Sequence, residues 1–273
     1  MEKIKRSERL ALMLLLLSQN PNKLFTLTHL SEQFGAAKST LSEDVTAIKD
    51  LLSRGGLGRL ETVPGAAGGV KYLPFLTIEQ SREVVEKLCD KLCDPKRILP
   101  GGFIYSVDVL TDPTIVRPLG QIVASLFYRN NPDIIVTVES SGVPFAMMVA
   151  ESLCKPLVIA RRDNRIADGS VVSLNYLSTS SKRLQTMSLP RRAVHEGQRA
   201  LVVDDFIKGG GTVTALWNMM KEFVVTIVGV VALIKSGTHV PRVMHEIKSL
   251  LTLESVDEDN EKTTLLPSSW LYK

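Results

Sequence analysis

Cysteine and histidine are scarce in this 273-residue sequence, which has three of the first and four of the second. Cys89 and Cys93 lie four residues apart and Cys154 stands alone, so no spacing predicts a disulfide framework or a Cys/His zinc site. Metal-ligand spacing is equally absent among the histidines, which are His29, His195, His239 and His245. We therefore expect reduced thiols and no dedicated metal centre.

Long apolar runs are missing as well. Residues 10–17 are apolar and follow a basic start, as in a signal peptide, but the run is too short to span a bilayer and no small-residue cleavage site follows. We expect a soluble, cytoplasmic protein. The hydrophobic fraction of 44% and charged fraction of 23% are those of a globular chain. The net charge of +4 is compatible with an anionic partner without requiring one.

Residues 1–75 carry the signals of a small helical domain that ends in a β-ribbon. Helices are expected around residues 10–17, at 28–34 and from Thr40, where Thr40 and Glu43 have the spacing of a capping box. An apolar stripe at helical spacing marks the third helix and consists of Leu41, Val45, Ile48 and Leu52. Short strands at 57–63 and 70–73, joined by small residues, then form a wing.

Three helices and a wing are a recurrent way to present one helix to the DNA major groove. Small polar side chains at the start of the third helix suit base edges, and the surrounding cations suit phosphates. The candidate DNA-binding residues are Lys5, Arg6, Lys38, Ser39, Thr40, Ser42, Arg54, Arg59, Gly68, Gly69 and Lys71. An ordinary helical cap with solvated lysines is the alternative.

Residues 76–273 alternate between two patterns. An amphipathic helix at 77–93 comes first, and β-branched apolar runs of strand length are then separated by helical stretches. The strands are expected at 134–138, 157–160, 200–203 and 225–233, and the helices at 114–129, 143–153, 211–223 and 241–249. Buried strands that alternate with helices predict a parallel sheet in an α/β domain. The acidic residues near 257–261 are expected to form a solvated end.

The most specific segment is LVVDDFIKGGGT, residues 201–212, in which a buried strand leads to two acids, a glycine-rich loop and a helix. Glycines let backbone amides approach a phosphate closely, and the helix N-terminus adds its dipole. Asp204 and Asp205 can accept hydrogen bonds from the two hydroxyls of a ribose. The segment therefore predicts a site for a ribose 5-phosphate. A tight strand-to-helix turn with solvated acids is the alternative.

This segment resembles the binding signature for phosphoribosyl pyrophosphate (PRPP) of type I phosphoribosyltransferases. The resemblance implies that Asp204 and Asp205 contact the ribose and that the following loop, Lys208, Gly209, Gly210, Gly211 and Thr212, wraps the 5-phosphate. VTVESSGVP, residues 136–144, resembles the pyrophosphate loop of the adenine and xanthine enzymes and implies contacts from Ser140, Ser141 and Gly142. Those enzymes usually carry Arg or Lys at the position of Ser141. Arg161 and Arg162 could compensate for the lost charge, and ordinary surface charge is the alternative for these two residues.

Both halves together resemble the purine operon repressors of Gram-positive bacteria, which join a winged helix to a phosphoribosyltransferase-like domain. The matching segments include AAKSTLSEDV, TVPGAAGGVKY, RILPGG and LVVDDFIKGGGT. The resemblance implies a non-catalytic homodimer that binds operator DNA and is released by PRPP, with guanine alarmone nucleotides competing for the pocket. It adds Phe103, Tyr105 and Phe206 to the pocket, and Phe103 stands where the family tends to have Tyr.

Two other functions remain open. The first is a working adenine or xanthine phosphoribosyltransferase, because the PRPP motif is shared with those enzymes. The second is a DNA-binding protein whose larger domain serves only as a dimerisation scaffold. Magnesium is an expected companion of PRPP, because Mg²⁺ favours phosphate oxygens and needs few protein ligands.

Overall fold

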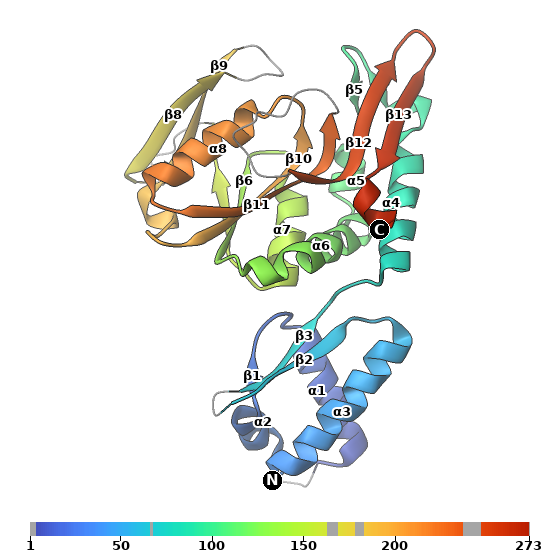
Figure 1. The fold of residues 1–273 in the computed structure, drawn as a ribbon, viewed down its shortest axis with the longest axis vertical. Coiled ribbons are helices and arrows are strands. Elements are labelled where there is room, and N and C mark those ends of the chain that lie inside the picture. The colour runs from blue at the N-terminus through green and yellow to red at the C-terminus, as the bar shows by residue number, and fades with distance from the viewer. Residues whose placement is uncertain (1–3, 66–67, 163–168, 178–182, 237–246, 273) are drawn as a thin grey trace. The chain divides into compact units, whose positions relative to one another are not determined.

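The computed structural model of the protein describes residues 4–65, 68–162, 169–177, 183–236 and 247–272 (Figure 1). The chain forms two compact units, residues 1–77 with 151–154 and residues 78–150 with 155–273. Each unit encloses a buried apolar core of its own.

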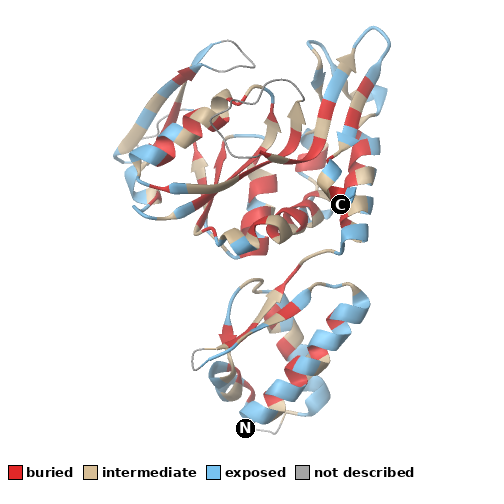
Figure 2. Cartoon of the chain, in the orientation of Figure 1, coloured by how far each residue is buried: buried red, intermediate tan, exposed pale blue. Residues whose placement is uncertain are grey.

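The first unit is a winged helix-turn-helix. Its elements are α1 (Arg6–Ser18), β1 (Phe25–Thr26), α2 (Leu27–Phe34), α3 (Lys38–Gly55), β2 (Arg59–Val63) and β3 (Gly69–Leu73). The strands form an antiparallel sheet in the order β1-β3-β2. Met13 of α1, Leu30 of α2 and Leu41 of α3 are fully buried in one core (Figure 2). The predicted third-helix stripe is part of this core, and the predicted wing is the β2–β3 ribbon.

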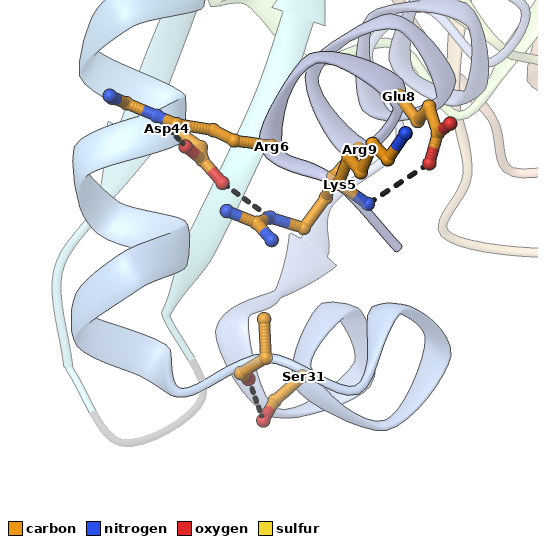
Figure 3. Close-up of polar contacts among 7 residues, drawn as sticks. Lys5, Arg6, Glu8, Arg9, Ser31 and Asp44 are labelled. Atoms are coloured by element: carbon orange, nitrogen blue, oxygen red, sulfur yellow. Dashed lines mark hydrogen bonds and ion pairs between the residues drawn. The ribbon is translucent and has the colours of Figure 1, made fainter. Parts of the chain in front are cut away.

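The turn between α2 and α3 differs from the prediction. Gly35 ends α2 in the left-handed conformation at φ 61°, and the Ser31 hydroxyl donates to the Ala36 carbonyl at 2.7 Å (Figure 3). The chain therefore reverses early, and α3 starts at Lys38 with Ala37 as an N-cap that has no side-chain hydrogen bond. The predicted capping box at Thr40 was wrong, because Thr40 already lies inside the helix.

The second unit is built on a six-stranded sheet in the order β13-β12-β11-β10-β6-β7 (Figure 1). All neighbouring strands are parallel except β13, which pairs antiparallel with β12. The strands are β6 (Ile134–Val138), β7 (Leu157–Ala160), β10 (Arg199–Ile207), β11 (Thr226–Ser236), β12 (Lys248–Asp257) and β13 (Lys262–Pro267). Every residue of β6 is buried, as expected for a parallel strand covered on both faces.

Helices and two hairpins complete this unit. The helices are α4 (Ile78–Leu92), α5 (Val107–Leu110), α6 (Pro113–Phe127), α7 (Val143–Leu153) and α8 (Gly211–Glu222). The hairpins are β4 (Ile98–Leu99) with β5 (Phe103–Ile104), and β8 (Val171–Leu177) with β9 (Leu184–Pro190). The 3₁₀ turns are η1 (Pro95–Arg97), η2 (Tyr128–Asn130), η4 (Arg191–Ala193) and η5 (Ser269–Tyr272).

The C-terminal part of the prediction needs correction. Residues 241–246 of the expected last helix lie outside the described residues, and residues 248–249 belong to strand β12. The acidic residues near 257–261 form the turn between β12 and β13, so Glu258, Asp259 and Glu261 are exposed as expected but do not form an end of the chain. Asp257 accepts from the backbone and the side-chain amide of Asn260, at 3.0 and 2.8 Å. This local pairing is the chemistry of a tight turn.

The apolar run at residues 10–17 lies within α1. Met13 and Leu17 of this helix are fully buried in the core of the first unit. Within the described residues, no helix combines the length and the apolarity needed to cross a membrane.

Gly120 lets α6 and α7 pack with their backbones close together. A Cβ atom on Gly120 would lie 2.6 Å from the backbone carbonyl carbon of Met148. We predict that Gly120→Ala lowers the unfolding free energy by about 1–3 kcal/mol, because the helices must move apart. Thermal unfolding measures the change.

Gly55, near the end of α3, provides the matched control. A Cβ atom there would meet only the flexible Leu57 side chain, at 3.3 Å. Alanine is a better helix former than glycine by about 1 kcal/mol. Gly55→Ala should therefore leave stability unchanged or raise it, and equal losses in the two variants would contradict the packing explanation.

Candidate functional site

A cavity of about 300 Å³ lies at the carboxyl ends of the central strands of the second unit. The chain runs from β6 to β7 on one side of the sheet, whereas β10 leads to β11 and β12 on the other. The strand order therefore reverses between β6 and β10. Ligands of open α/β sheets bind in the crevice at such a reversal, beyond the carboxyl ends of the strands.

Most of the predicted ligand residues line this cavity together. From the β10–α8 segment they are Asp204, Asp205, Phe206, Lys208, Gly209, Gly210, Gly211 and Thr212, and from elsewhere they are Ser140, Ser141, Arg162 and Phe103. Residues more than a hundred positions apart in the sequence thus meet at one site.

The glycine-rich loop joins β10 directly to α8. β10 is longer than expected and runs through both acids to Ile207, so the loop is short. Gly210 is the N-cap of α8 and adopts φ 72°, a left-handed conformation that costs little without a Cβ atom. The Thr214 hydroxyl donates to the Gly210 carbonyl at 2.8 Å. The first turn of α8 therefore presents amides and its positive dipole end at the cavity, which suits a phosphate.

Asp204 is the buried member of the acid pair. Only 9% of this residue is exposed, and one carboxylate oxygen accepts from the Asp205 backbone amide at 3.0 Å. Burial raises the pKa of Asp204 well above its usual value, and the neighbouring Asp205 carboxylate raises it further. The more distant Arg162 lowers this pKa only partly. The site therefore holds a carboxyl group that gains from hydrogen-bond donors such as ribose hydroxyls.

Two cations lie at the cavity. The Lys208 ammonium is 5.7 Å from the centre of the Phe103 ring, which belongs to the β4–β5 hairpin. Arg162 also lines the cavity, and its backbone amide donates to the Glu139 carboxylate at 3.0 Å. The cations and the start of α8 favour an anion, whereas the acids favour hydroxyl groups. The arrangement suits a ligand with a phosphate at one end and a sugar at the other.

The hairpin that carries Phe103 is held by an ion pair. Arg97 donates from both terminal nitrogens to Asp108 of α5, at 2.7 and 2.8 Å. This bidentate contact lowers the pKa of Asp108 to about 2. The Arg97 side chain also donates to the Tyr105 carbonyl at 3.0 Å.

Three predicted ligand residues are not among those that line the cavity: Gly142, Arg161 and Tyr105. Gly142 supports the acid pair instead, because a Cβ atom there would lie 3.2 Å from a carboxylate oxygen of Asp204 and 3.1 Å from the Asp205 amide. Arg161 pairs with Ser188 through both backbone hydrogen bonds, at 2.9 and 2.7 Å. Tyr105 is 44% exposed and contributes its backbone to the Arg97 contacts.

The sequence did not reveal the rest of the lining. Glu139 precedes the predicted Ser140–Gly142 loop and could have been included with it on adjacency alone. The apolar wall had no sequence signal, because its members come from six separate elements and look like ordinary core residues. They are Ile104, Leu110, Val138, Val213, Leu233, Ile234 and Leu253.

Metal ligands do not gather in the described part of the chain, where no group of three or more His, Cys, Asp or Glu side chains is arranged to hold an ion. His239 and His245 lie outside the described residues. Asp204 and Asp205 are the carboxylates nearest the predicted phosphate loop.

The surface of α3 in the first unit offers the predicted DNA contacts. Lys38, Ser39 and Ser42 are exposed at its start, and Thr40 is half-buried. Lys5 and Arg54 are exposed as well. These side chains place donors and positive charge on the helix-turn-helix, as a DNA-reading helix requires.

The remaining DNA candidates have structural partners. Lys71 forms an ion pair with Glu61 across the wing at 3.2 Å, and the Arg59 guanidinium lies 5.3 Å from the centre of the Phe75 ring. Gly68 and Gly69 are required by close backbone packing, because Cβ atoms there would lie 2.2 Å from the Val63 carbonyl oxygen and 2.1 Å from the Phe25 carbonyl oxygen. Arg6 binds Asp44 of α3 at 3.1 Å.

Comparison with known proteins finds a matching family for each of the two units. Residues 5–74 match the family described as "Bacterial purine repressor, N-terminal", and residues 110–267 match the family of phosphoribosyl transferase domains. The adenine phosphoribosyltransferase of Thermoanaerobacter pseudethanolicus is similar in structure with a TM-score of 0.54 at 20% identity, over 62% of this chain and 99% of that chain. At this identity the likeness concerns the fold alone.

Two relatives match nearly the whole chain. The purine biosynthesis transcriptional repressor of Bacillus subtilis is 42% identical over 255 residues, which cover 93% of this chain and 90% of that protein. The purine biosynthesis transcriptional activator of Lactococcus lactis is 37% identical over 257 residues, which cover 94% and 95%. The fold is that of a winged-helix DNA-binding protein with a phosphoribosyltransferase domain. The chain belongs to the bacterial purine repressor family.

The pKa of Asp204 generates a prediction about stability. Between the ordinary pKa of an aspartate and the raised one, the folded protein binds more protons than the unfolded chain, so the unfolding free energy falls as pH rises. Asp204→Asn removes the ionisation. We predict that this variant melts higher than the wild type in the absence of ligand, and that the difference grows from pH 5 to pH 8.

Asp205→Asn is the comparison variant, because it keeps the Asp204 ionisation but removes the neighbouring charge that raises the Asp204 pKa, so its stability should fall less with pH than that of the wild type. Melting temperatures of the three proteins at both pH values give the comparison. A difference between wild type and Asp204→Asn that stays constant with pH would contradict the buried ionisation.

Proposed function

We propose that this protein represses purine biosynthesis genes and that the cavity of its second unit senses a phosphorylated sugar. The proposal rests above all on one observation: a winged helix and a cavity with an acid pair and a phosphate loop occur in a single chain. The relative with 42% identity over most of its length is named a repressor, which favours repression over the activation named for the Lactococcus lactis relative. A bacterial regulator of this kind acts in the cytoplasm, where its operators are.

The effector that best suits the cavity is PRPP. Its 5-phosphate would bind the loop from Lys208 to Thr212, and its ribose hydroxyls would donate to Asp204 and Asp205. Its pyrophosphate would face Ser140, Ser141 and Arg162. Magnesium would be held chiefly by the pyrophosphate oxygens and water, with the acid pair as the available carboxylates, and would neutralise part of the ligand charge.

Control of DNA binding requires that PRPP bind the DNA-free protein more tightly than the DNA-bound protein. The protein would act as a homodimer on paired operator sites, with one winged helix at each site. Guanine alarmone nucleotides carry phosphates and a ribose like PRPP, and they would compete for the cavity.

The alternative function is catalysis, as in adenine or xanthine phosphoribosyltransferases. The acid pair and the phosphate loop are common to both functions and do not separate them. Ser141 separates them better, because it supplies no charge where those enzymes usually have Arg or Lys to hold pyrophosphate. We therefore propose a binding protein without turnover.

The central prediction concerns operator binding. Millimolar PRPP with Mg²⁺ should weaken operator binding at least tenfold, which corresponds to about 1.4 kcal/mol of coupling. Fluorescence anisotropy with a labelled operator fragment measures this, and ribose 5-phosphate with Mg²⁺ serves as the ligand control. Operator affinity that does not respond to PRPP would refute the proposed coupling.

The double variant Asp204→Ala, Asp205→Ala tests the site. It should bind the operator as the wild type does and lose its response to PRPP, because only the sugar contacts are removed. Calorimetry should detect no PRPP binding. A double variant that still responds would show that PRPP binds elsewhere.

Enzymatic activity gives a further test. Incubation with PRPP, Mg²⁺ and adenine, guanine, hypoxanthine or xanthine in turn should form nucleotide far more slowly than about 1 per second, an ordinary enzymatic rate. Chromatographic detection of nucleotide formed at or above that rate would favour the alternative function.

A further inference from the structure

A buried aspartate on α3 binds two arginines of α1 (Figure 3). The Asp44 side chain is fully buried on the inner face of this helix, between core residues Leu41 and Ile48. Its two carboxylate oxygens accept separately from the arginines, one from Arg6 at 3.1 Å and the other from Arg9 at 2.6 Å. The cluster Arg6–Asp44–Arg9 thus ties the start of α1 to the proposed DNA-reading helix.

The charges in this cluster do not balance. One carboxylate faces two guanidinium groups, which leaves a surplus of one positive charge. Arg9 has a 10% exposed side chain and the shorter contact, so it is the partner that a buried carboxylate requires. Arg6 is 61% exposed, and an exposed ion pair of this kind adds little stability. The stability of the fold therefore explains why Arg9 is paired with Asp44, but it does not explain the second, exposed cation, Arg6.

The geometry of Arg6 leaves most of its donors available. It binds Asp44 through Nε, the nitrogen nearest the side-chain stem. Within the part of the chain that the structure describes, the terminal nitrogens of Arg6 donate no hydrogen bond. A guanidinium presents a rigid fork of donors that fits phosphate in a bidentate contact. Arg6 is therefore able to hold the carboxylate and a second anion at once.

We propose that Arg6 bridges Asp44 on α3 and a phosphate of the DNA backbone. Nε holds the carboxylate, and the terminal nitrogens bind the phosphate. Asp44 and Arg9 are positioning residues, because Asp44 fixes the direction of Arg6 and Arg9 keeps the buried carboxylate neutralised. The inference rests on the proposed function. It adds that Arg6 couples the position of the bound phosphate directly to the position of the DNA-reading helix.

This arrangement would serve recognition in a specific way. Phosphate contacts fix the register of a protein on the duplex, whereas base contacts read the sequence. Because Asp44 lies two residues from Ser42 on the same helix, a phosphate bound to Arg6 would set the depth and rotation at which the start of α3 enters the groove. A cation on a flexible surface loop would supply the same charge without this constraint.

The salt dependence of operator binding tests the proposal with full-length protein. The logarithm of the association constant falls with the logarithm of salt concentration by about 0.9 for each phosphate neutralised. Arg6→Gln should therefore lessen the slope by about 0.9 and weaken binding about eightfold at 0.1 M salt. Arg9→Gln leaves Arg6 as the remaining partner of the buried Asp44 carboxylate, so it should lower the thermal unfolding temperature. Lys87→Gln, on the exposed surface of α4, controls for net charge and should change neither the slope nor the affinity.

Arg6→Lys separates the bridge from simple charge. A lysine keeps the positive charge, so the slope should stay near the wild-type value. It lacks the fork that holds two anions, so affinity should still fall severalfold. Thermal unfolding confirms that each variant is folded, and Arg6→Lys remains decisive if Arg9→Gln does not fold.

The outcomes distinguish this inference from the proposed function. A wild-type protein that binds no operator, or binds it without salt dependence, refutes the proposed function. A wild-type protein that binds with a steep slope, together with an Arg6→Gln variant of the same slope, refutes only the bridge. Arg6→Lys that binds as tightly as the wild type shows that Arg6 supplies charge without the second contact, which also overturns the proposal.

Discussion

The cavity of the second unit is built around a carboxyl group that is largely removed from water. Asp204 is buried in the C-terminal half of the central strand β10, beside a second acid whose charge raises its pKa further. An ionised carboxylate at this position is unfavourable, so we expect the empty site to be less stable than the same sheet with a neutral side chain. A ligand that donates hydrogen bonds relieves this cost. Under the proposed function, the binding of a sugar and the stability of the fold would therefore be linked through the Asp204 carboxyl group.

Asp44 shows the opposite solution to the same physical problem. This carboxylate is also fully buried, but two guanidinium groups bind its two oxygens directly. A buried acid that is paired in this way holds α1 and α3 together and has no need of a ligand. The comparison indicates why the two acids serve different purposes. A buried carboxylate is stable only with partners that neutralise its charge. Side chains of the protein supply such partners to Asp44 in the first unit, whereas they do not do so to the same extent for Asp204 in the second unit.

The sequence predicted the features that depend on neighbouring residues. The loop from Lys208 to Thr212 and the wing strands are local patterns, and the structure contains both. The sequence did not predict where α3 begins, because the turn before this helix involves a hydrogen bond from the Ser31 hydroxyl to the Ala36 carbonyl. Strands β12 and β13 were missed because their pairing is with each other and with β11. The apolar wall of the cavity and the partner of Arg6 arise from tertiary packing, which no periodicity records.

Gly142 limits how the sequence of such a protein can change near its cavity. Any side chain at this position would meet the acid pair, whereas Ser141 beside it faces the cavity. Position 142 of this loop therefore tolerates fewer kinds of residue than position 141. The charge at position 141 could therefore change over evolutionary time without disturbing the acid pair. Under the proposed function, a scaffold of this design could change its affinity for a diphosphate at one position without rebuilding its pocket.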